Sequence, residues 1–329
     1  MTERNIANRW AIVLAGGDGQ RMESFVRRWL GHPRPNQYCA FSGHRTMLEH
    51  TVDRALGVVE PERIVTVING DHRRFLEEPG RLTLPGRVLE QPRRCDTGPG
   101  VYFPLTHVMA HDPEALVAIM PSDHFIYPKE KFSALLEEAY DLAAYLPGQI
   151  VMLAARPDGP EDDYGWISPG MGLCGGRAMV VERFKEKPEA AAAAELYRGG
   201  GLWNTMIMVA RAAALWDIAR SLQPAMIARF DALRPWMGRA EEAEAVALAY
   251  RHMVCVNFSR DIIESAAEWT VAMPMDGVHW SDWGRAQRIT ETLAKIGKTQ
   301  SFPEQIVNEA PRLELEPQGT VGSVWANKS

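Results

Sequence analysis

The stretch Trp10-Ala-Ile-Val-Leu-Ala-Gly-Gly-Asp-Gly-Gln-Arg-Met22 decides the fold that the sequence predicts. Its six apolar residues, 10–15, are typical of a strand buried on both faces of a parallel sheet. The glycines that follow let backbone N–H groups converge on an anion, and Arg21 adds a charged fork suited to phosphate oxygens. The stretch has neither the GxGxxG pattern of an NAD-dependent dehydrogenase nor the Gly-Lys-Ser/Thr ending of a P-loop. Taken alone, a tight turn between a strand and a helix explains it equally well.

Strand and helix patterns alternate outward from this stretch. We expect further strands at 63–68, 88–91, 115–120 and 149–154, and helices at 46–56, 97–109 and 129–145. Such alternation predicts an α/β fold with a doubly wound, mostly parallel sheet and helices on both faces. Ligands of such sheets bind beyond the carboxyl ends of the strands, where Gly16 and Asp123 fall.

The second half of the chain has a different pattern. Strand-like pieces at 166–167, 178–184 and 206–209 are separated by turns rich in glycine and proline. A helical stretch at 212–250, interrupted at Pro224 and Pro235, precedes a strand at 269–273 and a helix at 283–294. We therefore expect one domain over 1–298, divided into a first half at about 10–155 and a smaller α+β half with a helical cover at about 156–298. Residues 299–329 lack periodicity and are expected to form a surface-laid or disordered tail.

Composition narrows the class of protein. The chain has 329 residues and a formal net charge of −6, which disfavours nucleic acid as a partner. No apolar run is long enough to span a membrane, and residues 1–10 lack the apolar core of a signal peptide. The four cysteines are far apart and form no CxxC pair, which suits a reducing compartment. We expect a cytoplasmic protein without membrane contact, and the sequence leaves homo-oligomer formation open.

Four short motifs carry residues suited to binding chemistry. Asp123 follows a buried strand in Pro121–His124 and could ligate Mg²⁺, or could cap the next helix. Asp282 lies between tryptophans in His279–Gly284 and has the same two interpretations. Two of the seven lysines of the chain occur in Phe184–Pro188, where a solvated charge run is the ordinary explanation. Asn204 opens a strand in Trp203-Asn204-Thr205, where strand-edge packing would suffice.

Seven motifs in this order resemble the mannose-1-phosphate guanylyltransferases. The motifs are GGxGxR at 16–21, QP…TGPG at 91–100, PSDH at 121–124, PExxYGWI at 160–167, FxEKP at 184–188, LWNT at 202–205 and WSDWG at 280–284. The resemblance runs from about Trp10 to about Leu293. It implies a Rossmann-like fold that joins a nucleoside triphosphate to a sugar 1-phosphate and releases pyrophosphate, by positioning and charge neutralisation.

The resemblance also implies roles for individual residues. It implies that GMP is transferred from GTP to mannose 1-phosphate with Mg²⁺ as the cofactor, and that Arg21, Lys187 and Asp123 carry the catalysis. The expected nucleotide-binding residues are Leu14, Gly16, Gly17, Gly19, Arg21, Asn36, Gln91, Thr97, Gly98 and Asp123. The expected sugar-binding residues are Tyr164, Gly165, Glu186, Lys187 and Asn204, and the expected metal ligands are Asp123 and Asp282.

This sequence departs from the family pattern on the nucleotide side. Asn36 stands where the family has a lysine that contacts the triphosphate, and an asparagine supplies no positive charge. Losing such a charge could cost several kcal/mol of barrier, by analogy with lost oxyanion donors. We therefore hold two hypotheses: an active transferase, slow or with Arg34 in place of the lysine, and a weak or inactive homologue that senses a nucleotide or sugar phosphate. Little chain follows Leu293, so we expect neither the cupin-like domain nor the β-helix of longer relatives.

Overall fold

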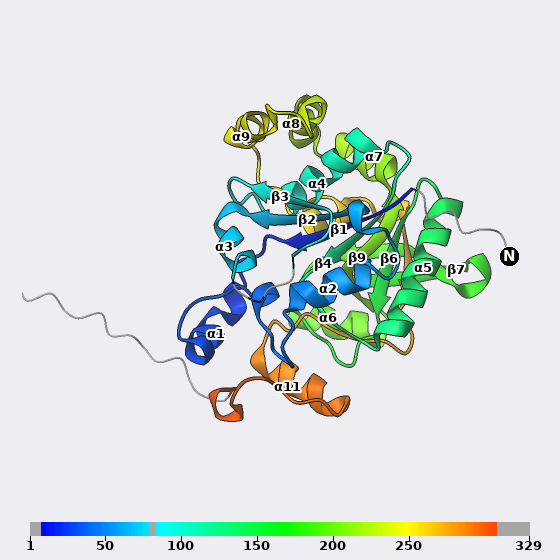
Figure 1. Cartoon of the computed structure of the whole chain (residues 1–329). Coiled ribbons are helices and arrows are strands. Elements are labelled where there is room, and N and C mark those ends of the chain that lie inside the picture. The colour runs from blue at the N-terminus through cyan, green and yellow to red at the C-terminus, as the bar shows by residue number, and fades with distance from the viewer. Residues whose placement is uncertain (1–7, 79, 81–82, 308–329) are drawn as a thin grey trace, which may run out of the picture.

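A nine-stranded sheet forms the centre of the computed structural model, which describes residues 8–78, 80 and 83–307 (Figure 1). The strand order is β3-β2-β1-β4-β9-β6-β10-β8-β7. The register pairs show that β9 and β8 run opposite to the other seven strands. The strands are β1 (Arg9–Ala15), β2 (Ile64–Asn69), β3 (Arg87–Gln91), β4 (Leu116–Pro121), β6 (Ile150–Ala155), β7 (Trp166–Leu173), β8 (Ala178–Lys185), β9 (Leu202–Arg211) and β10 (Thr270–Pro274). The predicted α/β fold with a mostly parallel sheet is confirmed.

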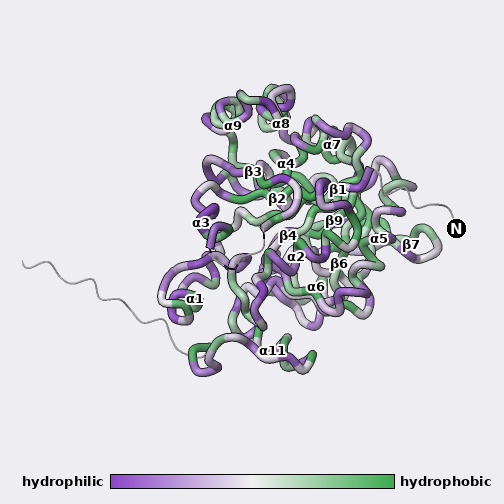
Figure 2. The backbone as a smooth tube through the Cα atoms, in the orientation of Figure 1, coloured by the Kyte–Doolittle hydropathy of each residue, from purple (hydrophilic) through white to green (hydrophobic). Residues whose placement is uncertain are grey.

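The alternation of side chains along β1 explains why helices cover both faces of the sheet. Trp10 and Ile12 enter one apolar core, while Ala11 and Val13 enter another. Every residue of β1 except Leu14 is buried, as a strand covered on both faces requires. In Figure 2 the hydrophobic colour gathers on the central strands and the hydrophilic colour on outer helices and loops.

One group of helices lies on each face. The first face carries α4 (Thr97–His111), α7 (Ala212–Leu222), α8 (Pro224–Leu233), α9 (Glu242–Arg251) and the short α10 (Phe258–Asp261). The other carries α2 (Met47–Ala55), the short α3 (Arg73–Leu76), α5 (Lys129–Tyr145) and α6 (Ala190–Arg198). The helical stretch expected at 212–250 is therefore three helices. Pro224 begins α8, because proline at the first helical position removes an N–H that has no partner there.

A third apolar cluster involves two helices that Figure 1 shows below the sheet. It joins α1 (Glu23–Leu30) to α11 (Ala286–Lys295) through Phe25, Phe41 and Trp283. Phe302 and Val307 are buried in the same cluster, so the first part of the expected tail packs on the domain. The rest of that tail, 308–329, lies outside the described residues. A two-stranded sheet of β5 (Phe125–Tyr127) and β11 (His279–Ser281) connects this region to the main sheet. No helix among residues 8–307 that the structure describes is both long and apolar enough to cross a bilayer.

Candidate active site

A cleft of about 450 Å³ lies at the carboxyl ends of β1 and β4, where doubly wound sheets bind ligands. Of the sixteen residues predicted for the site, thirteen line it. They are Leu14, Gly16, Gly17, Arg21, Gln91, Thr97, Asp123, Tyr164, Gly165, Glu186, Lys187, Asn204 and Asp282. Gly19, Asn36 and Gly98 do not line it.

The glycine loop after β1 is fixed through its carbonyl groups. The Gln37 side-chain amide donates to the carbonyl oxygens of Ala15 and Gly17, at 2.9 and 2.7 Å. The Asn69 side chain donates to the Gly16 carbonyl at 2.6 Å. These bonds occupy the carbonyl oxygens on the protein side, so the backbone amides are what the loop offers to an anion in the cleft. A Cβ on Gly16 would lie 2.9 Å from Nε2 of Gln91, which explains a glycine there.

Gln91 ends β3 and is held in one orientation. Its Oε1 accepts a hydrogen bond from the Tyr250 hydroxyl at 3.1 Å, and its Nε2 donates to Asn69 at 3.4 Å. Near it, Thr97 begins α4 and its hydroxyl accepts from the backbone N–H of Phe258. Gly98 packs against Val256, whose carbonyl oxygen accepts from the Gly98 N–H at 2.7 Å. Gly98 is therefore a packing residue behind the cleft, since a Cβ there would collide with Val256.

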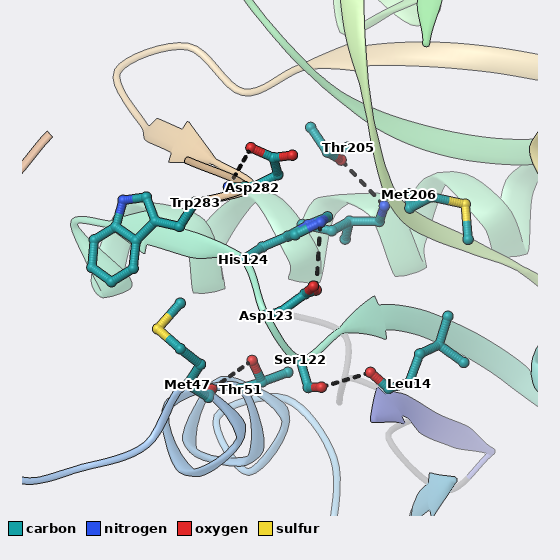
Figure 3. Close-up of polar contacts among 12 residues, drawn as sticks. Leu14, Met47, Thr51, Ser122, Asp123, His124, Thr205, Met206, Asp282 and Trp283 are labelled. Carbon is teal, nitrogen blue, oxygen red and sulfur yellow. Dashed lines mark hydrogen bonds and ion pairs between the residues drawn. The ribbon is translucent and has the colours of Figure 1, made fainter. Parts of the chain in front are cut away.

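Two aspartates stand in the middle of the cleft, one from each half of the chain. Asp123 follows β4 and is partly exposed, with its Oδ1 3.8 Å from Nε2 of His124. Asp282 is buried, and its Oδ1 accepts from the Tyr164 hydroxyl and the Gly284 N–H. In Figure 3 the ring of His124 lies between the two carboxyl groups. Burial is the main cause that lowers the pKa of His124, with Arg54 and Arg21 adding to it and Asp123 and Asp282 opposing it. A neutral ring can accept the hydrogen bond that Trp280 donates to its Nδ1.

Arginines hold Asp282 in its ionised form. Arg21 lies 2.8 Å from Oδ2 of Asp282, and Arg288 lies 3.0 Å from Oδ1. Burial would raise the pKa of Asp282, but Arg21, the Gly284 amide, His124 and Arg288 outweigh it and lower the pKa to about 2. Arg288 also forms an ion pair with Glu161, and its guanidinium group lies 4.7 Å from the centre of the Tyr164 ring. Its side chain therefore contacts Glu161, Tyr164 and Asp282 at the same time. Arg288 is not among the predicted site residues, because no motif in the sequence distinguishes it from a surface arginine on a helix.

A buried carboxyl oxygen of the half-buried Glu186 lacks a hydrogen-bond partner at the other end of the cleft. Oε2 of Glu186 has none among the described residues, and burial raises the pKa of Glu186. A Cβ on Gly165 would lie 2.7 Å from this oxygen, so a larger residue there would displace the carboxyl group. Lys187 has φ 42°, a left-handed conformation that is uncommon for lysine. Asn204 lies in β9, and two hydrogen bonds fix its position. Its backbone N–H donates to the Gly165 carbonyl oxygen, and its side-chain Oδ1 accepts from the backbone N–H of Met206.

The residues around the departure at Asn36 are placed differently from the expectation. Asn36 is 4 % exposed, and its Oδ1 has no hydrogen-bond partner in the described structure. It lies under the glycine loop, since a Cβ on Gly19 would be 3.2 Å from that oxygen. The structure gives no support to Arg34 as the replacement for the lysine, because Arg34 pairs with Glu78 through both Nη atoms and does not line the cleft. Arg94 does line it, paired with Asp18 of the glycine loop and with Asp71.

Comparison with known proteins identifies the family. The family model described as nucleotidyl transferase matches residues 10–299. The chain belongs to the nucleotidyl transferase family. This nucleotidyl transferase is 30% identical over 303 residues to the xanthan biosynthesis protein XanB of Xanthomonas campestris pv. campestris, covering 90% of this chain and 62% of the relative. It is 28% identical to the mannose-1-phosphate guanylyltransferase of Escherichia coli K12, covering 91% and 63%. The chain thus spans less than two thirds of the length of these relatives.

The solved structures agree on the fold. One from Thermus thermophilus, titled mannose-1-phosphate geranyltransferase, has a TM-score of 0.70 at 25% identity and covers 86% of this chain and 79% of its own. Another, from Helicobacter pylori and titled mannose-6-phosphate isomerase, has a TM-score of 0.66 at 20% identity and covers 83% and 99%. Both structures therefore share the fold of this chain.

Proposed function

We propose that this nucleotidyl transferase transfers GMP from GTP to mannose 1-phosphate and releases pyrophosphate. The observation that carries the proposal is the division of one cleft into two ends with a pair of aspartates between them. The glycine loop and Gln91 suit a nucleotide at one end, and Glu186, Lys187 and Asn204 suit a sugar phosphate at the other. The similarity to the mannose-1-phosphate guanylyltransferase of Escherichia coli supports guanine as the base and mannose as the sugar.

The unpartnered Oε2 of Glu186 supports a sugar at its end of the cleft. Buried polar atoms in proteins are nearly always hydrogen-bonded, so this oxygen needs a donor from a ligand. A sugar hydroxyl is such a donor, and a carboxylate accepts from hydroxyls strongly. Lys187 would then neutralise the phosphate of the same ligand, because it follows Glu186 directly and lines the same cleft.

The chemical step needs few protein groups. A phosphate oxygen of the sugar 1-phosphate attacks the α-phosphorus, the bond to the β-phosphate oxygen breaks, and pyrophosphate takes that electron pair. The loop amides and Arg21 would hold the β- and γ-phosphates as charge develops on them. Lys187 would hold the attacking phosphate in line, and no covalent enzyme intermediate is required.

The two aspartates fit Mg²⁺ if Arg21 moves. Asp282 is ionised and Asp123 is partly exposed, and carboxylate oxygens are the ligands that Mg²⁺ prefers. Oδ1 of Asp282 is occupied by Tyr164, Gly284 and Arg288, which leaves Oδ2 for a metal. Arg21 now pairs with that atom, and its half-exposed side chain can turn from Oδ2 toward the phosphates. Bound there, Mg²⁺ would neutralise the charge of the two substrates.

Arg94 would supply the cation that Asn36 lacks. It approaches the glycine loop from the end of β3 and is held there by Asp18. A triphosphate in the loop would compete with Asp18 and Asp71 for its guanidinium group, which binds phosphate in bidentate fashion.

The alternative is a homologue that binds these ligands without turning them over. Asn36 supports it, because the residue is buried beneath Gly19 and brings no charge to the cleft. Pyrophosphate release is the test: the protein is mixed with Mg²⁺, mannose 1-phosphate and each common nucleoside triphosphate in turn. Release with GTP that Asp123→Asn abolishes supports the transferase. Ligand binding without release by any triphosphate overturns it in favour of the sensor, and Asn36→Lys should then restore turnover if the missing charge is the cause.

A further inference from the structure

A second cavity, of about 440 Å³, borders the cleft at His124. Among the described residues, His124 is the only one that lines both. The walls of the second cavity come from 41–54, from 124–130 and from the Trp283 and Lys298 side chains. Figure 3 shows part of it: Met47 of α2 and Trp283 lie on one side of the 122–124 segment, away from Leu14. No role in the proposed reaction falls to this cavity.

The charge of this cavity is opposite to that of the whole chain. Its lining has four cationic side chains and two anionic ones, although the chain carries a net charge of −6. Two of the seven lysines, Lys129 and Lys298, are among the cationic ones. Desolvation lowers the pKa of His50, which also lines the cavity, and repulsion from Arg54, Arg45 and Lys298 adds to the effect. The cavity is therefore electropositive.

Arg54 is the deepest of these cations and has no ion pair among the described residues. It is 5 % exposed, and its Nη2 donates only to the Thr51 hydroxyl and, at 3.3 Å, to the His124 carbonyl oxygen. Its Nε has no hydrogen-bond partner in the described structure. Burial lowers the pKa of Arg54 to about 10, and the field of Asp53 offsets this only in part. A buried cation without a counter-charge is strongly unfavourable, so an anion at this position would relieve a cost already present in the fold.

We propose that this cavity binds a phosphate-bearing small molecule, with Arg54 as its anchor and Lys298 at its mouth. A guanidinium group with a free N–H matches phosphate oxygens. The volume lies within the range of small-molecule sites and exceeds what a bare phosphate fills. The apolar side chains of Phe41, Tyr127 and Trp283 provide walls for the organic part of the molecule.

Binding there acts on the cleft through one short segment. Arg54 holds the carbonyl of His124, and His124 follows Asp123, which lines the cleft. An anion that draws the Arg54 guanidinium toward itself weakens this bond and changes the position of the Asp123 segment. The coupling rests on the nucleotide site proposed above but not on turnover, because nucleotide affinity reports the position of the segment. Binding of the anion itself is measured without a nucleotide, so a failure of the proposed function is distinguishable from a failure of this inference.

Binding is measured by calorimetry with inorganic phosphate, glucose 6-phosphate and adenosine monophosphate as probes. Four variants separate the two cavities: Arg54→Met, Lys298→Glu, its matched control Lys295→Glu on α11, and Lys187→Ala in the cleft. We expect saturable binding that survives Lys187→Ala and Lys295→Glu. Lys298→Glu should weaken it by roughly fivefold or more, because two unit charges change beside the anion. Tighter binding of an ester than of inorganic phosphate indicates a metabolite, and equal binding limits the site to the free anion.

Three results would overturn the inference. In the first, no probe binds to the protein. In the second, probe binding disappears in Lys187→Ala and survives in Lys298→Glu, which would place the bound probe in the cleft. A third result concerns the coupling: the saturating probe leaves the affinity for GTP unchanged. The role of Arg54 would then be limited to its hydrogen bond with the His124 carbonyl oxygen. Lys298→Glu decides the matter even if Arg54→Met does not fold, because Lys298 is exposed.

Discussion

Replacing Gly165 with alanine should weaken sugar-phosphate binding and spare the nucleotide. The added Cβ would lie 2.7 Å from Oε2 of Glu186, 3.1 Å from Cζ of Phe184 and 3.2 Å from Cβ of Asn204. Contacts below 3.0 Å do not persist, and the carboxyl group is the end of a flexible side chain, so Glu186 moves. The sugar then loses a hydrogen bond to a charged acceptor, which is worth about 1.5–3 kcal/mol. At about 1.4 kcal/mol per factor of ten, its affinity should fall roughly 10- to 150-fold.

The assay is calorimetric titration of mannose 1-phosphate and, separately, of GTP. Gly148→Ala is the matched control, since a Cβ there meets nothing within 4 Å. We expect both affinities to be unchanged in the control and only the sugar-phosphate affinity to fall in Gly165→Ala. The reasoning would be refuted by a folded Gly165→Ala protein that binds mannose 1-phosphate as tightly as the wild type, or that loses both ligands equally.

The remaining predictions concern charges on both sides of the cleft. Arg94→Gln should raise the KM for GTP about tenfold and leave that for the sugar phosphate unchanged, because one charge-assisted contact is lost; equal KM values in variant and wild type would remove Arg94 from the site. Arg288→Met should lower the thermal midpoint and raise the pKa of Asp282, which loses a cation at 3.0 Å; an unchanged pH profile of GTP binding near acid pH would contradict this. The lowered pKa of Asp282 contributes stability that is present above its unfolded value of 3.8 and is lost as the pH falls toward about 2. The stability difference between wild type and Asp282→Asn, about 2 kcal/mol at pH 7, should therefore shrink over that window in chemical denaturation series, and a constant difference would show that Asp282 is not held ionised by its partners.

The sequence predicts the strand framework well, because continuous apolar runs such as 10–15 have few alternatives to a buried strand. The expected strand at 206–209 is the middle of β9, which extends over Leu202–Arg211. The helix expected at 283–294 starts three residues later, at Ala286, since Trp283 and Gly284 remain in the loop that carries Asp282. Pro99 does not prevent α4, because it lies in the first turn, where an N–H has no helical partner. Pro104 lies inside α4, and the helix continues past it to His111.

Other elements leave weaker signals in the sequence. α1 was missed although its apolar residues at 25, 26, 29 and 30 recur at helical spacing. They pack on a cluster that includes the distant Phe302. α6 begins with five alanines and buries only Ala193, so no apolar stripe marks it. The small sheet of β5 and β11 pairs Phe125 with Ser281 across half the chain, and such a three-residue pairing has no local pattern.

The sequence likewise predicts some residues of the candidate site and not others. Thirteen predicted residues meet in one cleft because their motifs lie at or next to strand ends that the fold brings together. The sequence spacing did not predict the positions of the Asn36 and Arg34 side chains. Asn36 lies beneath Gly19, and Arg34 forms an ion pair with Glu78. The supporting side chains Gln37, Asn69 and Arg288 act through hydrogen bonds between distant segments, which a single sequence does not reveal.

The most direct test of the central claim follows the phosphorus atoms of GTP. Two reactions are run with Mg²⁺ and mannose 1-phosphate, one with label in the α-phosphate and one with label in the γ-phosphate. If the cleft transfers a nucleotidyl group, the α-label appears in a nucleotide sugar and the γ-label in pyrophosphate, and both are lost in Asp123→Asn. Release of the γ-label as orthophosphate, or an α-label that stays in unreacted GTP at every protein concentration, would contradict the account.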